Sequence, residues 1–510
     1  AWELVLLQVC NVSILNLDIT MMNIDYSQFL NMIPEVTLMA ALMIVFITDL
    51  FTAKKPGEAR NRNWFNPLVC VLMLAHIFIN IWPTEASTAF GGMYMTNGSV
   101  GVIKTILAFS VLIVFVQSRE WLQREDTNFK EGEFYELVLA TLLGMNMMVS
   151  ANHFLLFFLG LEMASVPMAC LVAFDKYRHN SAEAGAKFIL TATFSSGVML
   201  YGISFLYAAT GTLYFDDVMA NISATPLCIL GMVFFFSGLG FKISLVPFHF
   251  WTADTYQGAP TTVTGYLSVT SKGAAAFALC AILMKVFAPI VEYWQIMLMV
   301  VIVLSITIGN LFAIHQKDLK RFMAFSSISQ AGYIMLAVVG NSAMSVTALS
   351  YYVLIYVVAN LAVFSIIAAV EENNGGVVNM NAYNGFYKTN PRLAFLLTLA
   401  LFSLGGIPPF AGMFSKFFVF MAAANGAQVT TAIGATIYAV VFIALVNTVI
   451  SLYYYLLIVK AMFISDNENP LPTFKSSCST KMALAICTLG VVAFGVCSIV
   501  YNWIHAASVM

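Results

Sequence analysis

The stretch that decides the fold is residues 234–275, FFFSGLGFKISLVPFHFWTADTYQGAPTTVTGYLSVTSKGAA. It predicts an apolar helix that carries Lys242, breaks at Pro247 and is followed by a second helix that carries Lys272. Both lysines lie far from any polar segment through which they would reach water. Because a lysine at mid-bilayer depth costs about 2.5–3.5 kcal/mol on insertion scales, the pair indicates a functional site inside a membrane.

The composition of the whole chain agrees with a membrane protein. The 510 residues are 60% hydrophobic and only 9% charged, which is typical of a polytopic membrane protein. The net charge of −2, without a basic stripe or tail, excludes a nucleic-acid partner. The eight cysteines are scattered without any CxxC pair, so we expect no disulfides, zinc or iron–sulfur cluster in this chain.

Apolar runs divide the chain into spans of about 20 residues each. They fall at 28–52, 64–83, 100–118, 133–150, 152–174, 183–209, 222–254, 259–287, 291–315, 319–339, 343–370, 392–424, 430–462 and 480–505. These runs predict an all-α polytopic protein with about 14 transmembrane helices. Residues 1–20 contain no Lys or Arg, which excludes a secretory signal, and the segment 1–26 has no assigned role.

Cationic side chains gather in alternate connections between these runs. They are Lys54, Lys55, Arg60, Arg62, Arg119, Arg124, Lys130, Lys176, Arg178, Lys317, Lys320, Arg321, Lys388, Arg392, Lys460, Lys475 and Lys481. The intervening connections carry Glu85, Asp216, Asp217 and Glu292, with Lys104 and Lys285 at helix ends. The positive-inside rule therefore puts both termini on the outer side. It also makes Lys317, Lys320 and Arg321 topological anchors of their loop.

Four lysines remain inside the predicted spans: Lys187, Lys242, Lys272 and Lys416. One acid, Glu162 in the fifth span, joins them. Arginine keeps its proton in proteins, whereas a buried lysine can release its proton. The choice of lysine at all four positions therefore favours reversible proton carriage over a fixed structural charge.

Two of the runs, 222–254 and 392–424, are longer than one crossing of a hydrocarbon core about 30 Å thick requires. Each contains a breaker, Pro247 in the first and Pro408–Pro409 in the second. The lysine precedes the break in the first run, which heads inward, and follows the break in the second, which heads outward.

This pattern predicts two inverted five-helix repeats, with broken helices in the seventh and twelfth spans. The predicted repeats are residues 131–288 and 289–465. The first three helices lie in 27–130, and the last helix lies in 466–510.

The charged candidates near the start of the first repeat each have a structural alternative. Glu162 facing a lysine forms either a charge-sensitive switch or a static pair that pins two helices. Lys187 lies only a few residues into its helix, so it either joins the lysine series or reaches the inner interface.

The candidates near the breaks have alternatives as well. Lys242, Lys272 and Lys416 either carry protons or cap carbonyl groups that the breaks set free. His249, two residues beyond Pro247, either shuttles protons with an ordinary pKa of about 6.5 or bonds those carbonyls.

Four motifs in order resemble one known family. They are FLGLEMASVP at 158–167, VPFHFWTADTYQGAPTTVTGYLSVTSK at 246–272, DLKRFMAFSSISQAGY at 318–333 and LFSLGGIPPFAGMFSKF at 401–417. Over about residues 27–505 the chain resembles the antiporter-like membrane subunits of bacterial respiratory complex I, NADH–quinone oxidoreductase. The YQGAP form and a lysine at position 416 resemble the N-type more than the M-type subunit.

The resemblance implies a hydrophilic axis along the membrane centre, formed by Glu162, Lys187, Lys242, Lys272 and Lys416 with His249 beside the first break. It also implies a bacterial inner-membrane location between an M-type antiporter-like subunit and a small K-type subunit. NADH, FMN, iron–sulfur clusters and quinone would belong to partner subunits, with no cofactor in this chain. One departure stands out: many relatives carry histidine where this chain has Gln330, which cannot take up and release a proton.

We therefore expect a proton-translocating subunit of complex I without redox chemistry of its own. Two other functions stay open. One is a subunit of a related multisubunit cation/proton antiporter. The other is a structural scaffold within the same complex, whose lysines only pack.

Overall fold

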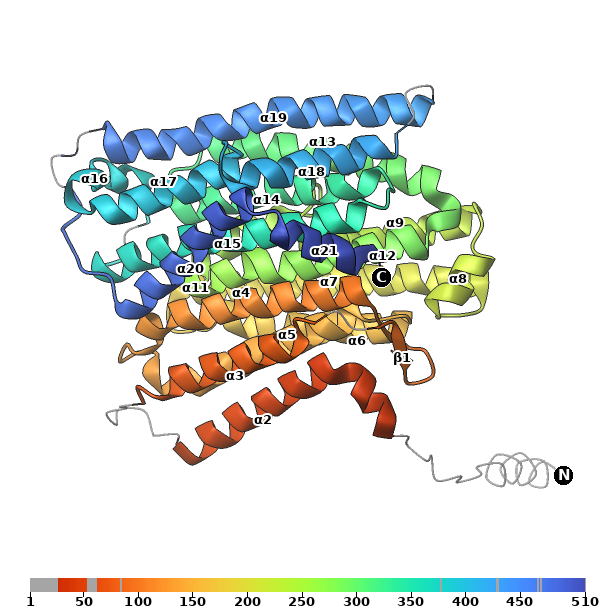
Figure 1. Cartoon of the computed structure of the whole chain (residues 1–510), viewed down its shortest axis with the longest axis horizontal. Coiled ribbons are helices and arrows are strands. Elements are labelled where there is room, and N and C mark those ends of the chain that lie inside the picture. The colour runs from red at the N-terminus through yellow and green to blue at the C-terminus, as the bar shows by residue number, and fades with distance from the viewer. Residues whose placement is uncertain are drawn as a thin grey trace.

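The computed structural model describes residues 26–52, 62–82, 85–376, 378–427, 431–465, 467 and 470–509. Residues 1–25 of the predicted N-terminal segment, and the loop cations Lys54, Lys55 and Arg60, lie outside this part. The long helices run side by side in one bundle, with α19 at one edge and α2 at the other (Figure 1).

The elements follow the apolar runs of the sequence. The helices are η1 (Tyr26–Met32), α2 (Ile33–Thr52), α3 (Phe65–Asn80), α4 (Gly98–Leu122), η2 (Asn128–Lys130), α5 (Glu131–Val149), α6 (Phe154–Val172), α7 (His179–Thr210), α8 (Phe215–Asn221), α9 (Pro226–Ile243), α10 (Phe250–Gly258), α11 (Thr261–Tyr266), η3 (Leu267–Ser271), α12 (Lys272–Lys285), η4 (Ala288–Ile290), α13 (Val291–Ile314), α14 (Leu319–Val339), α15 (Ser345–Asn373), η5 (Met380–Tyr383), α16 (Phe386–Thr389), α17 (Pro391–Gly405), α18 (Ala411–Asn425), α19 (Ala432–Phe463), α20 (Cys478–Val496) and α21 (Ile499–Val509). A short antiparallel hairpin pairs β1 (Ser87–Ala89) with β2 (Tyr94–Thr96), and the sequence analysis did not predict it.

The all-α membrane fold is confirmed. In the described part of the chain, 11 helical segments are long and apolar enough to cross a membrane. The other predicted spans hold shorter or more polar helices: α3 has 16 residues, α17 and α18 have 15 each, and α5 begins with three glutamates. The count of about 14 spans and the inverted repeat stay predictions.

Both predicted breaks are present. α9 ends at Ile243 and α10 begins at Phe250, so the break contains Pro247. α17 ends at Gly405 and α18 begins at Ala411, so the break contains Pro408 and Pro409. A proline lacks the amide donor that a continuous helix needs, and this explains why both helices stop here.

The last predicted span, 480–505, is wrong as a single helix. α20 ends at Val496, Cys497 is extended, and α21 begins at Ile499. The turn comes where α20 meets the second break, because a Cβ atom on Gly495 would lie 2.7 Å from the Ala411 nitrogen. A close helix approach, rather than a breaker residue, therefore accompanies the bend.

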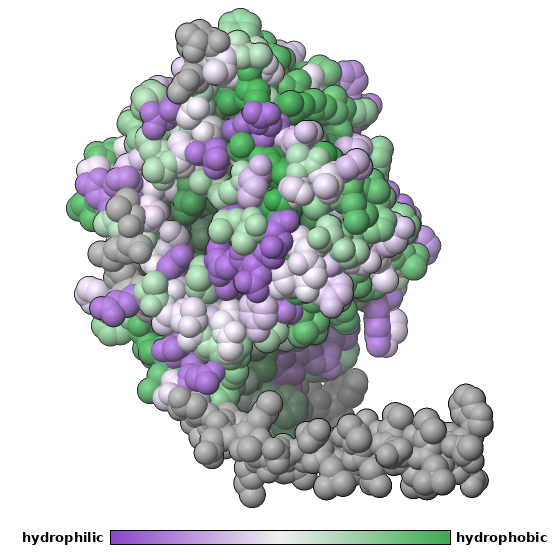
Figure 2. Space-filling model, turned by 90° about the vertical axis from the view of Figure 1, so that its right-hand side faces the viewer, coloured by the Kyte–Doolittle hydropathy of each residue, from purple (hydrophilic) through white to green (hydrophobic). Residues whose placement is uncertain are grey.

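The connections fall at two opposite ends of the bundle. α8 and β1 lie at one end, and α16 lies at the other (Figure 1). Thr347 at the start of α15 bonds Ser508 of α21 at 2.5 Å, so α21 ends at the β1 end. Figure 2 looks at the β1 end, where a hydrophilic patch lies in the middle of a face that elsewhere mixes hydrophilic and hydrophobic residues.

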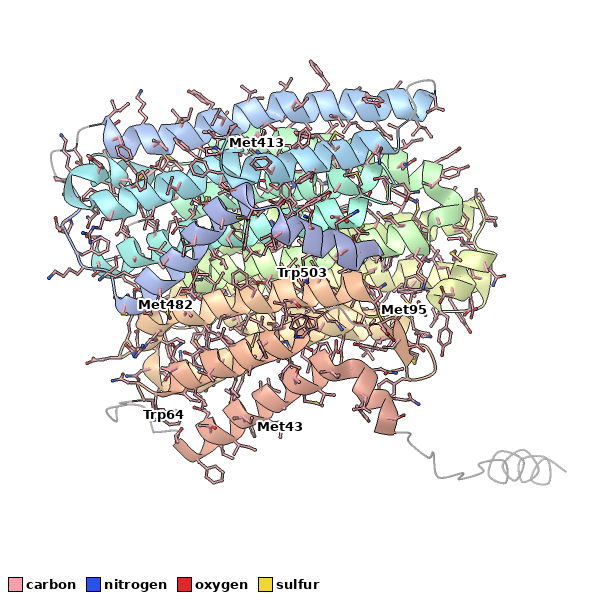
Figure 3. All side chains as sticks on the ribbon, viewed as in Figure 1. Met43, Trp64, Met95, Met413, Met482 and Trp503 are labelled. Carbon is pink, nitrogen blue, oxygen red and sulfur yellow. The ribbon has the colours of Figure 1, made fainter. Side chains whose placement is uncertain are left out.

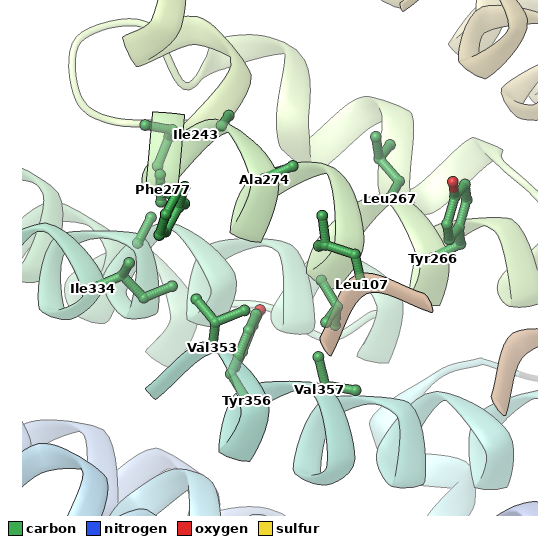
Figure 4. Close-up of a cluster of buried hydrophobic side chains, with 14 of the residues drawn as sticks. Leu107, Ile243, Tyr266, Leu267, Ala274, Phe277, Ile334, Val353, Tyr356 and Val357 are labelled. Atoms are coloured by element: carbon green, nitrogen blue, oxygen red, sulfur yellow. The ribbon is translucent and has the colours of Figure 1, made fainter. Parts of the chain in front are cut away.

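The core of the bundle lies between α4, α12, α14 and α15. Leu107, Phe277, Ile334, Val353 and Val357 meet there and are almost fully buried (Figure 4). All residues of α14 except Arg321 are buried. Packing against the neighbouring helices therefore encloses the polar groups of α14 inside the bundle.

Candidate functional site

Lys242 lies in the last turn of α9. Ser244 takes a left-handed conformation with φ 67°, and the Leu245 amide donates to the Gly240 carbonyl at 2.8 Å. This C-terminal motif ends the helix directly after the lysine. The Lys242 side chain is buried, and its Nζ atom lies 5.5 Å from the centre of the Phe188 ring.

Polar atoms without a partner surround the first break. Among the described residues, Lys242 Nζ, Ser244 Oγ, His249 Nδ1, Thr252 Oγ1 and Thr255 Oγ1 are buried and have no hydrogen-bond partner. His249 is 7% exposed and stands directly before α10. Buried polar groups are nearly always satisfied, often by ordered water. The break therefore fits a hydrated connection that runs from α9 into α10.

Lys272 follows a π-helical turn, η3, that interrupts the helix formed by α11 and α12. Such turns often occur at functional positions. The Lys272 ammonium donates to Ser327 Oγ of α14. The hydroxyl of Tyr256 lies 3.3 Å from the same Ser327 oxygen, and Lys272 Nζ lies 5.4 Å from the Tyr256 ring centre. Ser327 thus joins the second lysine to the broken helix.

Lys416 lies beyond the second break, in α18. Gly406 ends α17 with φ 85°, and the Ile407 amide donates to the Phe402 carbonyl at 3.0 Å. The helix end has the same geometry as the end at Ser244. The buried Lys416 donates to the Gly405 carbonyl at 3.1 Å, and its Nζ lies 5.0 Å from the Tyr333 ring centre.

Gln330 lies between Lys272 and Lys416, in a network of polar groups. Its amide donates to Tyr455 Oη at 3.3 Å and to the Leu404 carbonyl at 3.4 Å, and its carbonyl accepts from Tyr352. A cavity of about 10 Å³ is lined by both Gln330 and Lys416. This is the volume that one water molecule needs.

Glu162 lies on α6 and is partly buried. Its Oε1 has no hydrogen-bond partner, and Glu162 forms no ion pair with any residue that the structure describes. The direct Glu162–lysine pair considered from the sequence is therefore not formed here.

Lys187 lies apart from the other lysines. It bonds Glu183 and Asp254 at 2.8 Å each, and its side chain is 45% exposed. Asp254 also bonds Arg321 at 2.6 Å. The structure thus places Lys187 in an exposed ion cluster that also contains Arg321 of α14, and not against Lys242.

Lys320, predicted as a topological anchor of its loop, lies in the first turn of α14. It is 4% exposed and donates to the Ala259 carbonyl at 2.7 Å. It lines a cavity of about 370 Å³ at the α16 end of the bundle, together with Asp175 and Thr261. Its position one residue inside an apolar helix was the available signal.

Lys104, predicted at a helix end, lies in the second turn of α4 and was not expected to be buried. It is 1% exposed and bonds Glu35 at 2.6 Å and Tyr94 at 2.9 Å. Tyr94 also donates to Glu35 at 2.8 Å. The buried cluster of Glu35, Tyr94 and Lys104 joins α2, β2 and α4. The presence of one acid in the first apolar run and one base in the third was the signal for it.

Lys285 lies at the end of α12, as predicted, and bonds Asp216 of α8 at 2.7 Å. The hydrogen bond from Lys285 is the main cause that lowers the pKa of the Asp216 carboxyl below its usual range. Asn152 donates to Asp216 as well, at 3.1 Å. This cluster marks the end of the bundle opposite the Lys320 cavity.

Comparisons with known proteins identify the family of this chain. A family model described as NADH:quinone oxidoreductase/Mrp antiporter, transmembrane, matches residues 151–458. A Phocaeicola vulgatus protein named NADH-quinone oxidoreductase subunit N is 56% identical over 486 residues, 95% of this chain and 100% of the relative. A protein of the same name from Azobacteroides pseudotrichonymphae is 48% identical and covers 95% of this chain and 98% of its own length.

A solved structure shows the same fold. A chain of Thermus thermophilus respiratory complex I with bound aureothin matches with a TM-score of 0.76 and 28% identity, covering 92% of this chain and 98% of that chain. The fold and the buried lysines thus define an antiporter-like, multi-pass membrane protein. The chain belongs to the NADH-quinone oxidoreductase subunit N family, whose members are subunits of complex I.

Proposed function

We propose that this subunit moves protons through a central series of buried lysines, coupled to quinone reduction in other subunits. The observation that carries the proposal is the alternation of buried lysines with hydroxyl and amide groups. Lys242, Lys272 and Lys416 are each nine-tenths or more buried, and Ser327 and Gln330 lie between the last two. Such a sequence of groups can hand protons on through side chains and single water molecules.

The route begins on the inner side. The cavity beside Lys320 opens there, and its lining includes Gly258, two residues from Tyr256. Lys242 accepts a proton across the polar break, and its protonation responds to the charge of Glu162. His249 serves the same break as a shuttle. Lys187, in the exposed ion cluster with Glu183 and Asp254, takes part where protons enter the route.

The route continues through the second repeat. Lys272 passes the proton by way of Ser327, and Gln330 holds the water that reaches Lys416. Lys416 then leads outward or to the next subunit. The matched helix ends at Ser244 and Gly406 support two halves that act alike.

Membership of the family supports a proposal for the cofactors, neighbouring subunits and membrane of this chain. We propose that this chain holds no redox centre, and that NADH, FMN, iron–sulfur clusters and quinone bind partner subunits. An M-type antiporter-like subunit would lie on one side and a small K-type subunit on the other. The bilayer would be the bacterial inner membrane, with both termini on the periplasmic side.

A multisubunit cation/proton antiporter is the second candidate, because the matching family model includes Mrp antiporters. The relatives named subunit N, at 56% and 48% identity, favour complex I. Co-purification with NADH-oxidising subunits supports the first function. Co-purification with antiporter subunits alone supports the second.

The function is tested by Lys242→Ala in the assembled complex. We expect the rate of NADH-driven proton uptake by proteoliposomes to fall at least about tenfold, because a positioned proton carrier contributes at least that much to the rate. Lys176→Ala, in an exposed inner loop, is the control. Unaltered uptake in a Lys242/Lys272 double variant with normal assembly would instead support a scaffold.

A further inference from the structure

A groove between the starts of α17 and α20 belongs to no part of the proton route. Its volume is about 580 Å³. Leu393, Leu396, Leu484 and Ala485 form an apolar floor from both helices. The groove is thus shaped to receive an apolar chain.

The rim of the groove is basic. Arg392, Lys475 and Lys481 line it and are exposed. Within the described part of the chain, none of the three forms an ion pair. Three unpaired cations at the mouth of an apolar groove favour an occupant with an anionic head and an apolar body.

The helix ends strengthen this charge. α17 begins at Pro391 and α20 begins at Cys478, and residues adjoining both starts line the groove. The amino-terminal end of a helix carries partial positive charge and attracts anions. An anionic head group would therefore lie between two helix amino termini and three cations.

The groove is continuous with the outer apolar surface of the same helices. Phe395 is 56% exposed, Met482 51% and Leu489 68%. Figure 3 labels Met482 on α20, near the end of the bundle where α16 lies. Because large apolar side chains are exposed beside the groove on helices of a membrane bundle, bilayer lipid has direct access to it.

We propose that this groove binds one anionic phospholipid of the inner leaflet. Its phosphate lies against Arg392, Lys475 and Lys481, and an acyl chain runs along Leu396 and Leu484 toward the membrane centre. The lipid fills the gap between α17, which ends at the second break, and α20, which bends beside that break. A lipid bound there would restrict movement of α17 relative to α20, and so stabilise the position of α18, which carries Lys416.

The test uses the whole complex, reconstituted in vesicles that contain photo-cross-linkable phosphatidylglycerol or photo-cross-linkable phosphatidylcholine. We expect phosphatidylglycerol to label peptides of α17 and α20. Labelling should fall at least about tenfold in the Arg392→Gln/Lys475→Gln/Lys481→Gln variant, since each basic residue near the surface contributes about one kcal/mol. The Lys176→Gln/Lys317→Gln/Lys460→Gln variant removes the same charge elsewhere, so its labelling should stay within about twofold.

A second variant separates the groove from general charge. Ala485→Trp fills the exposed floor and keeps all three cations, so it should also abolish labelling of α17 and α20. Equal labelling by phosphatidylcholine overturns the anionic preference. Undiminished labelling in Ala485→Trp overturns the site, as does a protein cross-link to another subunit in place of the lipid.

Discussion

At the scale of single residues, Gln330 shows how a side chain that does not titrate can organise a buried polar network. It holds Tyr352 and Tyr455 in fixed positions, and it faces Lys416 across a cavity for one water. The sequence showed only that a titratable group was missing at this position. The three partners of Gln330 come from α15, α17 and α19, which no local pattern predicts.

Gln330→Leu should lower both stability and pumping. It leaves the buried Tyr352 hydroxyl without its acceptor, which costs about 1–3 kcal/mol, whereas Tyr455 keeps its bond to Ser326. It also removes the polar wall of the cavity, so proton uptake per NADH should fall several-fold. Gln330→His keeps a donor and an acceptor and should retain most of the uptake. A Gln330→Leu variant that takes up protons as fast as the parent complex would contradict the role assigned to Gln330.

Asp216 provides a pH dependence outside the membrane. Lys285 holds the pKa of Asp216 below its unfolded value, so the pair stabilises the fold at pH values above that unfolded pKa. The contribution disappears as pH falls through the folded pKa. It stays under about 1 kcal/mol, because the Asp216 side chain is 55% exposed and therefore screened by solvent.

Asp216→Asn should therefore lower the thermal midpoint of the complex slightly at pH 6 and by less at pH 3. Scans of intrinsic fluorescence between these values measure the difference. Asp217→Asn is the matched control, since Asp217 has no cation partner among the described residues. A loss that is equal at both pH values would mean that the Asp216–Lys285 pair does not stabilise the fold.

At the scale of helices, prolines and run length were enough to predict both breaks. They could not predict the bend at Cys497, because residues 496–498 contain neither proline nor glycine. The bend accompanies the packing of Gly495 against the second break. Likewise, the depth of Lys104 and Lys320 depends on which helices surround them. Local sequence predicts an element, and tertiary packing decides the burial of its ends.

The second break also depends on one close approach. A Cβ atom on Gly412 of α18 would lie 1.7 Å from the Ser403 carbonyl oxygen of α17. Gly412→Ala should therefore force the two half-helices apart and lower stability by about 1–3 kcal/mol. Pumping should fall with it, because Lys416 follows one turn later in α18.

Gly197→Ala in α7 is the control for this change. Nothing lies within 4 Å of its added methyl group, so the variant should gain about 0.5–1 kcal/mol from helix propensity. Thermal midpoints of the two purified complexes give the comparison. Shifts in the same direction would show that helix propensity, and not the α17–α18 contact, decides the effect.

At the scale of the whole molecule, the distribution of charge defines two ends. Asp216 and Lys285 lie at the α8 end, and the Lys320 cavity lies at the α16 end. This arrangement agrees with the alternation of loop charge in the sequence. The family was also predictable from four motifs, because they carry the lysines and the breaks together.

Labelling with a membrane-impermeant maleimide tests the orientation. Asp217→Cys should react in right-side-out vesicles, whereas Lys317→Cys should react only after permeabilisation. The parent chain reports the background from its exposed native cysteines, which include Cys170, Cys478 and Cys497. The opposite pattern would reverse the predicted orientation of the whole bundle.

The buried group of Glu35, Lys104 and Tyr94 has a consequence for biosynthesis. α2 leaves the ribosome with an acid, and its basic partner follows only after α3 and the hairpin have been made. Until then the acid has no partner in the lipid, which is unfavourable for a solitary helix. α2 should therefore wait beside the translocon until α4 emerges, and the first three helices should enter the bilayer as one unit. An early amino-terminal segment thus sets the order in which the remaining chain is assembled.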